Sequence, residues 1–331
     1  QEVKNLFITL KSLINDGTTI LYITHKLEEV ISICDYVTIM RNGKVIDNSV
    51  IKNFTSKSLA TKMLGKNLSD IKIDYSCVKE ETKFEVKNLS HKYNDPFYTD
   101  LKNISFKVNK GEIFGIAGVA GNGQSELMDI LTGENINISS GEIIFNKNKI
   151  QNLGPQKRRD LSISFVPENR LGHSAVPELS LSENILLSQF PKNNFLKNGI
   201  ILKNNIDDYA NNVIKEFNVV TSGNDAKASS LSGGNLQKYV IGREISSNPK
   251  LLIVSHPTWG IDAGAEHAIR ESLIDLSQNG TSIIVISQDL DELLEITHKI
   301  SVINNGKLSN AFNTNEVEIE KLGLLMGGKD E

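Results

Sequence analysis

Residues 112–133 read EIFGIAGVAGNGQSELMDILTG, and this stretch decides the fold. Its first part, EIFGIAG, is apolar enough for a buried central strand. A glycine-rich loop, GVAGNGQ, follows, and SELMDILTG after it has a helical pattern. A strand, a glycine loop and a helix in this order begin a phosphate-binding α/β unit, because glycines let backbone N–H groups converge on phosphate oxygens at a helix N-terminus. The stretch therefore predicts a phosphate site at the loop.

Strand-like and helical runs alternate on both sides of this stretch. FEVKNLS at 84–90 and ISFKV at 104–108 precede it, while LLIV at 251–254 and SIIVIS at 282–287 follow it. Residues 180–218 have a helical pattern and lie between the strands as an insertion. This alternation predicts a layered α/β fold with a mostly parallel sheet, an N-terminal antiparallel β part and a helical insertion.

An internal repeat runs through the chain. Residues 15–46 align with residues 278–309 without a gap, at an offset of 263 that brings Gly17 onto Gly280. Such self-similarity indicates a duplicated domain. We expect residues 1–66 to be the end of a first copy, residues 67–83 a linker and residues 84–331 a complete second copy, so that the chain is a fragment of a longer tandem protein. A short protein with an appended helical cap is the alternative.

The glycine loop has the spacing of the phosphate-binding pattern GxxxxGK[ST], with one departure. Gln124 stands where the pattern has lysine, so it offers a hydrogen-bond donor but no positive charge to the β- and γ-phosphates. Ser125 keeps the hydroxyl that would contact Mg²⁺. Taken alone, the loop is also compatible with a plain strand-to-helix turn. The residues expected to face phosphate are Gly118, Gly121, Asn122, Gly123 and Gln124.

A second motif, LSGGNLQK, occupies residues 231–238. Its serine and two glycines open a helix whose N–H groups can face an anion. The string resembles the signature sequence of ABC-transporter ATP-binding domains, and the resemblance covers essentially the whole chain. It implies a P-loop NTPase fold of the ABC type, with ATP and Mg²⁺ as cofactors. The implied nucleotide contacts of the motif are Ser232, Gly233, Gly234, Asn235 and Gln237.

The same resemblance gives roles to residues outside these two motifs. Tyr93 matches the aromatic residue that stacks on adenine, although the sequence is equally compatible with an ordinary surface tyrosine. Glu168, in VPENR, stands where the family has a glutamine that senses metal and γ-phosphate. Asp262, in GID, resembles part of the loop that contacts the partner domain. His25, in THKLEE, matches the histidine that stabilises the γ-phosphate and the attacking water.

The second copy departs from the family at four positions. Gln124 replaces the lysine, Ser255 the metal-binding aspartate, His256 the catalytic glutamate and Gln288 the switch histidine that the first copy keeps as His25. His256 could in principle act as a base, but a non-catalytic replacement is the favoured interpretation. Each missing group reduces the rate by orders of magnitude, so we expect this fragment alone to hydrolyse ATP poorly or not at all. In the head-to-tail pair of the family, the first copy's glycine loop would face Ser232–Asn235.

Composition limits the classes of function. Acidic residues number 40 and basic residues 36, which argues against a large nucleic-acid-binding face. The two cysteines, Cys34 and Cys77, form no spaced cluster, so neither a disulfide framework nor a zinc site is expected. No apolar run approaches the ~20 residues of a membrane span.

The resemblance implies the ATP-binding protein of an importer, peripheral at the cytoplasmic face of the cell membrane. GVAGNGQSEL favours a nucleoside as the solute, with a monosaccharide as the alternative. The implied partners are integral-membrane permeases, an extracytoplasmic solute-binding lipoprotein reached through them, and the first nucleotide-binding domain in cis; a nucleic-acid partner is not expected. A ribosome or DNA-repair ABC protein would carry basic insertions or a coiled-coil arm, which the sequence does not show, whereas a non-hydrolysing regulatory or scaffold domain stays open.

Overall fold

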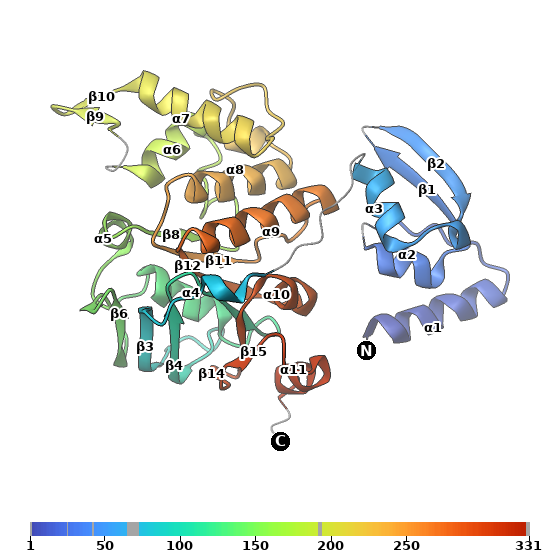
Figure 1. The fold of residues 1–331 in the computed structure, drawn as a ribbon, viewed down its shortest axis with the longest axis horizontal. Helices are drawn as coiled ribbons and strands as arrows, with labels where there is room; N and C mark the ends of the chain where they lie inside the picture. The colour runs from blue at the N-terminus through green and yellow to red at the C-terminus, as the bar shows by residue number, and fades with distance from the viewer. Residues whose placement is uncertain (1, 25, 42, 65–72, 191–193, 329–331) are drawn as a thin grey trace. The chain divides into compact units, whose positions relative to one another are not determined.

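A computed structural model describes residues 2–24, 26–41, 43–64, 73–190 and 194–328. The chain divides into two compact units, a small one built mainly on residues 2–64 and a large one built mainly on residues 73–328 (Figure 1).

The large unit is organised around a mostly parallel sheet. Five parallel strands lie side by side, in the order β8 (Ile163–Val166), β11 (Leu251–Ser255), β12 (Ser282–Ser287), β5 (Ile113–Ala117) and β13 (Lys299–Asn304). The short strands β14 (Lys307–Leu308) and β15 (Phe312–Asn313) pair antiparallel with β13. All residues of β5, β8, β11 and β12 are buried, as a parallel sheet covered on both faces requires. The predicted parallel sheet is confirmed.

A second, antiparallel sheet packs against this one. Its strands lie in the order β4 (Leu101–Asn109), β3 (Thr82–His91), β6 (Ser140–Phe145) and β7 (Asn148–Lys149). Phe106 of β4 stacks on Phe114 of β5, with ring centroids 5.2 Å apart, and both belong to the main hydrophobic core. The predicted N-terminal antiparallel part is therefore confirmed.

Helices complete the large unit. They are η2 (Tyr75–Cys77), α4 (Gln124–Thr132), α5 (Pro155–Asp160), η3 (Ala228–Ser230), α8 (Gly233–Ile245), α9 (Ala263–Gln278), α10 (Leu290–Ile296) and α11 (Ile319–Met326). None of the helices in the described part of the chain combines the length and the apolar character that a membrane crossing needs. Cys34 and Cys77 are both free.

The insertion between the strands consists of helix, hairpin and helix. It contains α6 (Leu181–Gln189), a hairpin of β9 (Leu196–Lys197) and β10 (Ile200–Ile201), and α7 (Lys203–Glu216), which Figure 1 shows beyond α8. The expectation of helix throughout 180–218 is thus wrong at 196–201. Asn198 and Gly199 both have positive φ, and Asn-Gly between two short strands is the preferred pair for a tight hairpin turn.

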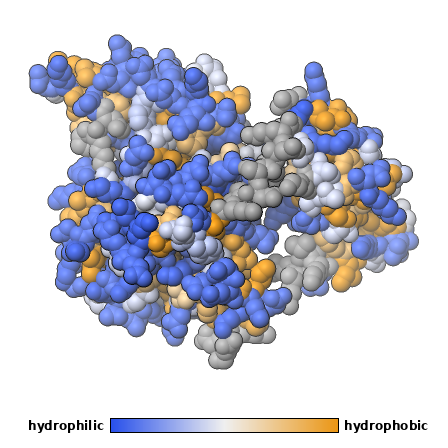
Figure 2. Space-filling model, in the orientation of Figure 1, coloured by the Kyte–Doolittle hydropathy of each residue, from blue (hydrophilic) through white to orange (hydrophobic). Residues whose placement is uncertain are grey.

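The small unit repeats the end of the large one. It contains α1 (Glu2–Asn15), α2 (Leu27–Ile33), β1 (Tyr36–Arg41), β2 (Lys44–Val50), η1 (Ile51–Asn53) and α3 (Ser56–Leu64). Shifted by 263 positions, the bounds of α2 coincide with those of α10, and those of β1 with those of β13. Val30, Ile39, Ile51 and Leu59 form its small core. Hydrophobic residues also lie at its surface, as Figure 2 shows, and Leu21 and Ile23 are each 88% exposed.

Candidate nucleotide-binding site

Several of the predicted site residues of the large unit lie at one edge of the parallel sheet. In the strand register, Ala117 at the end of β5 lies beside Ser287 at the end of β12, and Ser255 at the end of β11 lies beside Ile286. The glycine loop therefore begins directly after β5, His256 directly after β11 and Gln288 directly after β12, so all three follow neighbouring strand ends. The carboxyl edge of an open α/β sheet is the usual place for a ligand site.

Gln124 closes the glycine loop on itself. Its Nε2 donates to the carbonyl of Val119 at 2.8 Å, and its Oε1 accepts from the N–H of Asn122 at 3.2 Å. The side chain is only 6% exposed. Gly118 leaves room for it, because a Cβ at that position would lie 2.5 Å from Nε2. One backbone N–H expected to face phosphate is thus occupied by a neutral carboxamide of the same loop.

Neighbouring segments fix the loop from outside. The side-chain oxygen of Asn122 accepts from the N–H of Asn305 at 3.0 Å, and its carbonyl accepts from the N–H of Gly306 at 2.9 Å. The hydroxyl of Thr99 donates to the carbonyl of Gly121 at 2.8 Å. Ser125 is exposed in the first turn of α4. Contacts on both sides therefore hold the loop in place.

The positions that would anchor a metal and activate water carry neutral groups. Ser255 and His256 are both buried at the end of β11, where His256 has φ +48° and its N–H donates to the carbonyl of Ile286 at 2.8 Å. Burial lowers the pKa of His256, although the charges of Glu168 and Asp289 act in the opposite direction. Within the described ranges, no group of three or more His, Cys, Asp or Glu residues is arranged for a metal ion. The Asn122 N–H is therefore not free for a phosphate, and neither Ser255 nor His256 offers a carboxylate to Mg²⁺.

Gln288 is exposed and has no charge to offer, but a buried acid lies close to it in sequence. Glu292 accepts hydrogen bonds from the hydroxyls of Ser287 at 2.6 Å and Thr258 at 2.5 Å. It thus ties the start of α10 to the loop after β11. Sequence reasoning missed Glu292, although the repeat aligns it with Glu29, which accepts from Thr24 in the small unit at 3.3 Å.

Tyr93 packs among aromatic side chains of its own domain. Its ring stacks on Tyr98 with centroids 5.1 Å apart and an interplanar angle of 13°, and it meets His91 edge-on at 4.3 Å. Burial raises the pKa of Tyr93 to about 12. One face of the ring that was predicted to stack on adenine is therefore covered by Tyr98.

The start of the signature motif is exposed, whereas a backbone N–H of the glycine loop is bonded to Gln124. Ser232 precedes α8, and its hydroxyl accepts from the Asn235 side chain at 2.9 Å and from the Asn235 N–H at 3.5 Å. Ser232 and Gly233 are exposed, and the N–H groups of the first helical turn have no intrahelical acceptor. Gln237 differs from the expectation for a nucleotide contact, because it is buried and donates to the carbonyl of Pro257 at 2.9 Å.

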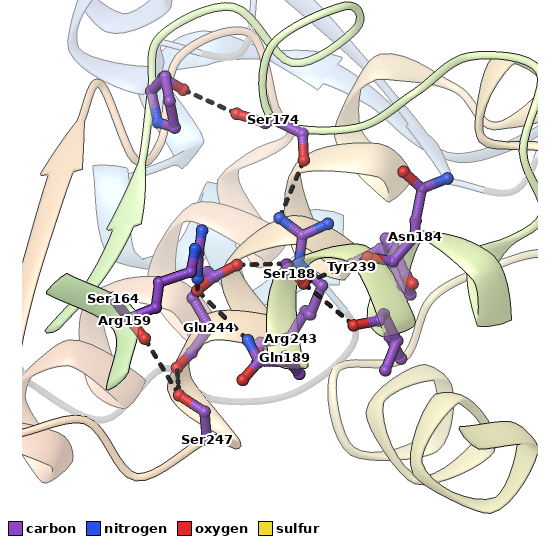
Figure 3. Close-up of polar contacts among 12 residues, drawn as sticks. Arg159, Ser164, Ser174, Asn184, Ser188, Gln189, Tyr239, Arg243, Glu244 and Ser247 are labelled. Atoms are coloured by element: carbon purple, nitrogen blue, oxygen red, sulfur yellow. Dashed lines mark hydrogen bonds and ion pairs between the residues drawn. The ribbon is translucent and has the colours of Figure 1, made fainter. Parts of the chain in front are cut away.

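A buried polar network joins the signature helix to the loop that carries Glu168 (Figure 3). Arg243 of α8 donates to the carbonyl of Ser174 at 2.9 Å, and the Ser174 hydroxyl donates to the carbonyl of Pro167 at 3.1 Å. Glu244 is fully buried and paired with Arg159 at 2.6 Å. Burial alone would raise the pKa of Glu244, but Arg159 and Arg243 hold this pKa below its usual range. This network fixes residues 167–175 relative to α8.

Comparison with known proteins agrees with this geometry. Residues 101–259 match the ABC transporter family, and the matched stretch contains both the glycine loop and the signature. The chain is 38% identical over 99% of its length to a nucleoside import ATP-binding protein of Lactococcus lactis, and 36% identical over 97% to a ribose import ATP-binding protein of Clostridium tetani. The chain belongs to the ABC transporter family.

The fold of the large unit is that of an ABC ATPase. A solved structure of an ATP-binding subunit of an ABC transporter superposes with a TM-score of 0.60 at 20% identity, and 74% of this chain covers all of that one. The chain spans 64% and 62% of the length of the Lactococcus and Clostridium relatives. The P-loop NTPase fold predicted from the sequence is confirmed.

The last two site residues predicted from the sequence are Asp262 and His25. Asp262 is exposed, and its Oδ1 accepts from the N–H groups of Gly264 and Ala265 at 3.0 Å each, so it begins α9 as a cap. His25, the predicted switch histidine, lies outside the described residues.

Proposed function

We propose that the chain is the ATP-binding part of an ABC importer in which residues 84–331 supply a working signature and a silent phosphate loop. One contrast carries the proposal: Gln124 closes the loop of this domain, whereas Ser232 and Gly233 of the same domain stay open. Random loss of motifs in a decaying domain would not be expected to spare the signature.

The signature would act on ATP bound by another domain. N–H groups at the start of α8 and the Ser232 hydroxyl would donate to the γ-phosphate, where the helix dipole favours negative charge. Water would then attack the γ-phosphorus while the bond to the ADP oxygen breaks, which gives ADP and phosphate. We propose His25 as the residue that positions this water, because THKLEE holds the family's switch position.

The domain that binds this ATP would be the first copy of the repeat. We propose residues 1–66 as the end of that copy, residues 67–83 as a linker and residues 84–331 as the second copy. The element bounds that coincide at an offset of 263 support this division. The shorter length of the chain relative to its ABC relatives agrees with it.

A nucleoside is the proposed solute, with a simple sugar as the alternative. The similar relatives include both a nucleoside and a ribose import protein, with only slightly different identities. We propose membrane permeases and, through them, a solute-binding lipoprotein as partners, and the cytoplasmic membrane face as the place of action.

The closed loop is tested on this chain with a fluorescent ATP analogue, Mg²⁺ and a phosphate-release assay. We expect weak nucleotide binding and no turnover. Gln124→Lys frees the Asn122 N–H and adds a positive charge, so nucleotide affinity should rise about tenfold or more without turnover. Gln278→Lys, at an exposed position, is the charge-matched control and should change nothing. Robust turnover by the unaltered chain would contradict the proposal.

The role of the signature is tested in the natural full-length protein. Ser232→Ala should reduce ATP turnover about a hundredfold, whereas Ser125→Ala should leave it within about twofold. Asp289→Ala removes a comparable helix cap from α10 and controls for loss of stability. If Ser232→Ala left turnover unchanged, residues 84–331 would be a non-hydrolysing scaffold domain.

A further inference from the structure

Arg170 lies between two glycines beside the signature. A Cβ built on Gly233, the first residue of α8, would be 2.9 Å from Arg170 Nη1. A Cβ on Gly260 would be 3.5 Å from Nη2. The absence of a Cβ on Gly233 therefore leaves space that the guanidinium fills, whereas a Cβ on Gly260 would meet it only at van der Waals distance. Arg170 thus borders the same helix end as Ser232.

The charge of Arg170 is not neutralised by its surroundings. Across the ranges that the structure describes, its guanidinium makes no hydrogen bond or ion pair with another residue, and the first turn of α8 has no acidic residue. A helix N-terminus carries positive partial charge, so a cation beside it is unfavourable unless an anion joins them. The guanidinium is half-buried, which lowers the pKa of Arg170.

The arginine is held in this place by its backbone. The N–H of Ala175 donates to the carbonyl of Arg170 at 2.8 Å, and the N–H of Ser174 donates to the carbonyl of Asn169 at 3.0 Å. Ser174 is in turn bound by Arg243 of α8 (Figure 3). The loop that carries Arg170 and the helix that carries the signature are thus connected by fixed contacts, and Arg170 Nη1 lies beside the first residue of that helix.

We propose that Arg170 binds the terminal phosphate of the ATP that docks on the signature of this domain. This inference rests on the proposed function, since the nucleotide comes from the other domain. A guanidinium offers several donors in a planar fork that suits phosphate oxygens, and it supplies positive charge that the serine and glycines cannot. Arg170 therefore distinguishes ATP from ADP at the composite site.

The test compares ATPγS with ADP, both with Mg²⁺, in the natural full-length protein. Arg170→Ala should weaken ATPγS binding about tenfold or more and leave ADP binding within about twofold, because only ATPγS has the terminal phosphate. Arg170→Lys should retain part of the affinity. Lys227→Gln removes an exposed charge from the segment just before the signature and should have no effect.

Three outcomes decide between the proposals. If Arg170→Ala is silent while Ser232→Ala weakens ATPγS binding, the inference about Arg170 is overturned and the proposed function stands. If neither substitution matters, both are overturned. An equal loss for ADP and ATPγS would mean that Arg170 only supports the fold. Should Arg170→Ala fail to fold, Arg170→Gln keeps the length of the side chain and is measured in the same way.

Discussion

Residues 18–24, TTILYIT, and residues 281–287, TSIIVIS, hold corresponding places in the two copies of the repeat but adopt different structures. In the second copy, residues 282–287 form β12, which is paired with β5 and β11 and buried throughout. In the first copy the same pattern forms no strand, and Leu21 and Ile23 are exposed where Ile284 and Ile286 are fully buried. An apolar, β-branched run becomes a parallel strand only when strands on both sides satisfy its backbone and cover its side chains.

Some local contacts are the same in the two copies. Thr24 donates to Glu29 as Ser287 donates to Glu292, five residues later in each case. Leu59 of α3 is 1% exposed, and Leu322, its counterpart in α11, is also buried. These short-range contacts thus form without the central sheet.

The strongest test of this comparison is a charge placed in each of the two runs. Ile284→Asp should destabilise the large unit by about 4 kcal/mol or more, because it buries an unpaired carboxylate in the central strand. Leu21→Asp in this chain should change the free energy of unfolding by no more than about 0.5 kcal/mol. Urea denaturation followed by circular dichroism measures both.

The same pair of variants in the full-length protein tests whether residues 18–24 form a central strand there. If the first copy has its own central sheet there, Leu21→Asp should become nearly as damaging as Ile284→Asp. If Leu21→Asp stayed harmless in the full-length protein, the run at 18–24 would not be a central strand and the repeat would not reflect two equal domains.

Where both copies are packed locally, matched truncations should have matched effects. Leu59→Ala and Leu322→Ala each remove a buried leucine from a helix and should each destabilise their own unit by about 2–4 kcal/mol. Thermal unfolding of the two single variants provides the measurement, with exposed Leu324→Ala as the control in α11. A much smaller effect at Leu59 would show that the core of the small unit is not specifically packed.

Much of this architecture could be predicted because it depends on patterns along the chain. Continuous apolar runs located β5, β11 and β12, and the glycine loop placed α4 after β5. The constant offset of the repeat identified matching helices and strands that the structure bears out in α2 and α10. The hairpin at 196–201 was missed, although Asn198-Gly199 carries its signal, because the helical pattern around it was extended too far.

The chemistry of the site needed three dimensions. Gln124 could be recognised as a lost lysine, but its hydrogen bonds to Val119 and Asn122 depend on loop geometry that no spacing encodes. Gln237 looked like a nucleotide contact and is buried against Pro257. The sequence shows Arg170 only as part of VPENR. Its contact with Gly233 could not be predicted, because the two residues are far apart in the sequence.

The smallest expected effect is a pH dependence carried by Glu292. Burial raises the pKa of Glu292, despite the hydrogen bonds from Ser287 and Thr258 that act in the opposite direction. A carboxyl with a raised folded pKa contributes its stability fully below about 4.3, the value for an unfolded glutamate, and loses it as pH rises through the folded value. The stability of the unaltered chain should therefore fall relative to that of Glu292→Gln between about pH 4 and neutrality.

Melting temperatures of both proteins across this range give the difference. Glu29→Gln, which alters the corresponding contact in the small unit, controls for the hydrogen bond itself. A difference that stays constant with pH would show that Glu292 is held by its two hydroxyl donors as a carboxylate, and that the contact between α10 and the loop after β11 does not titrate.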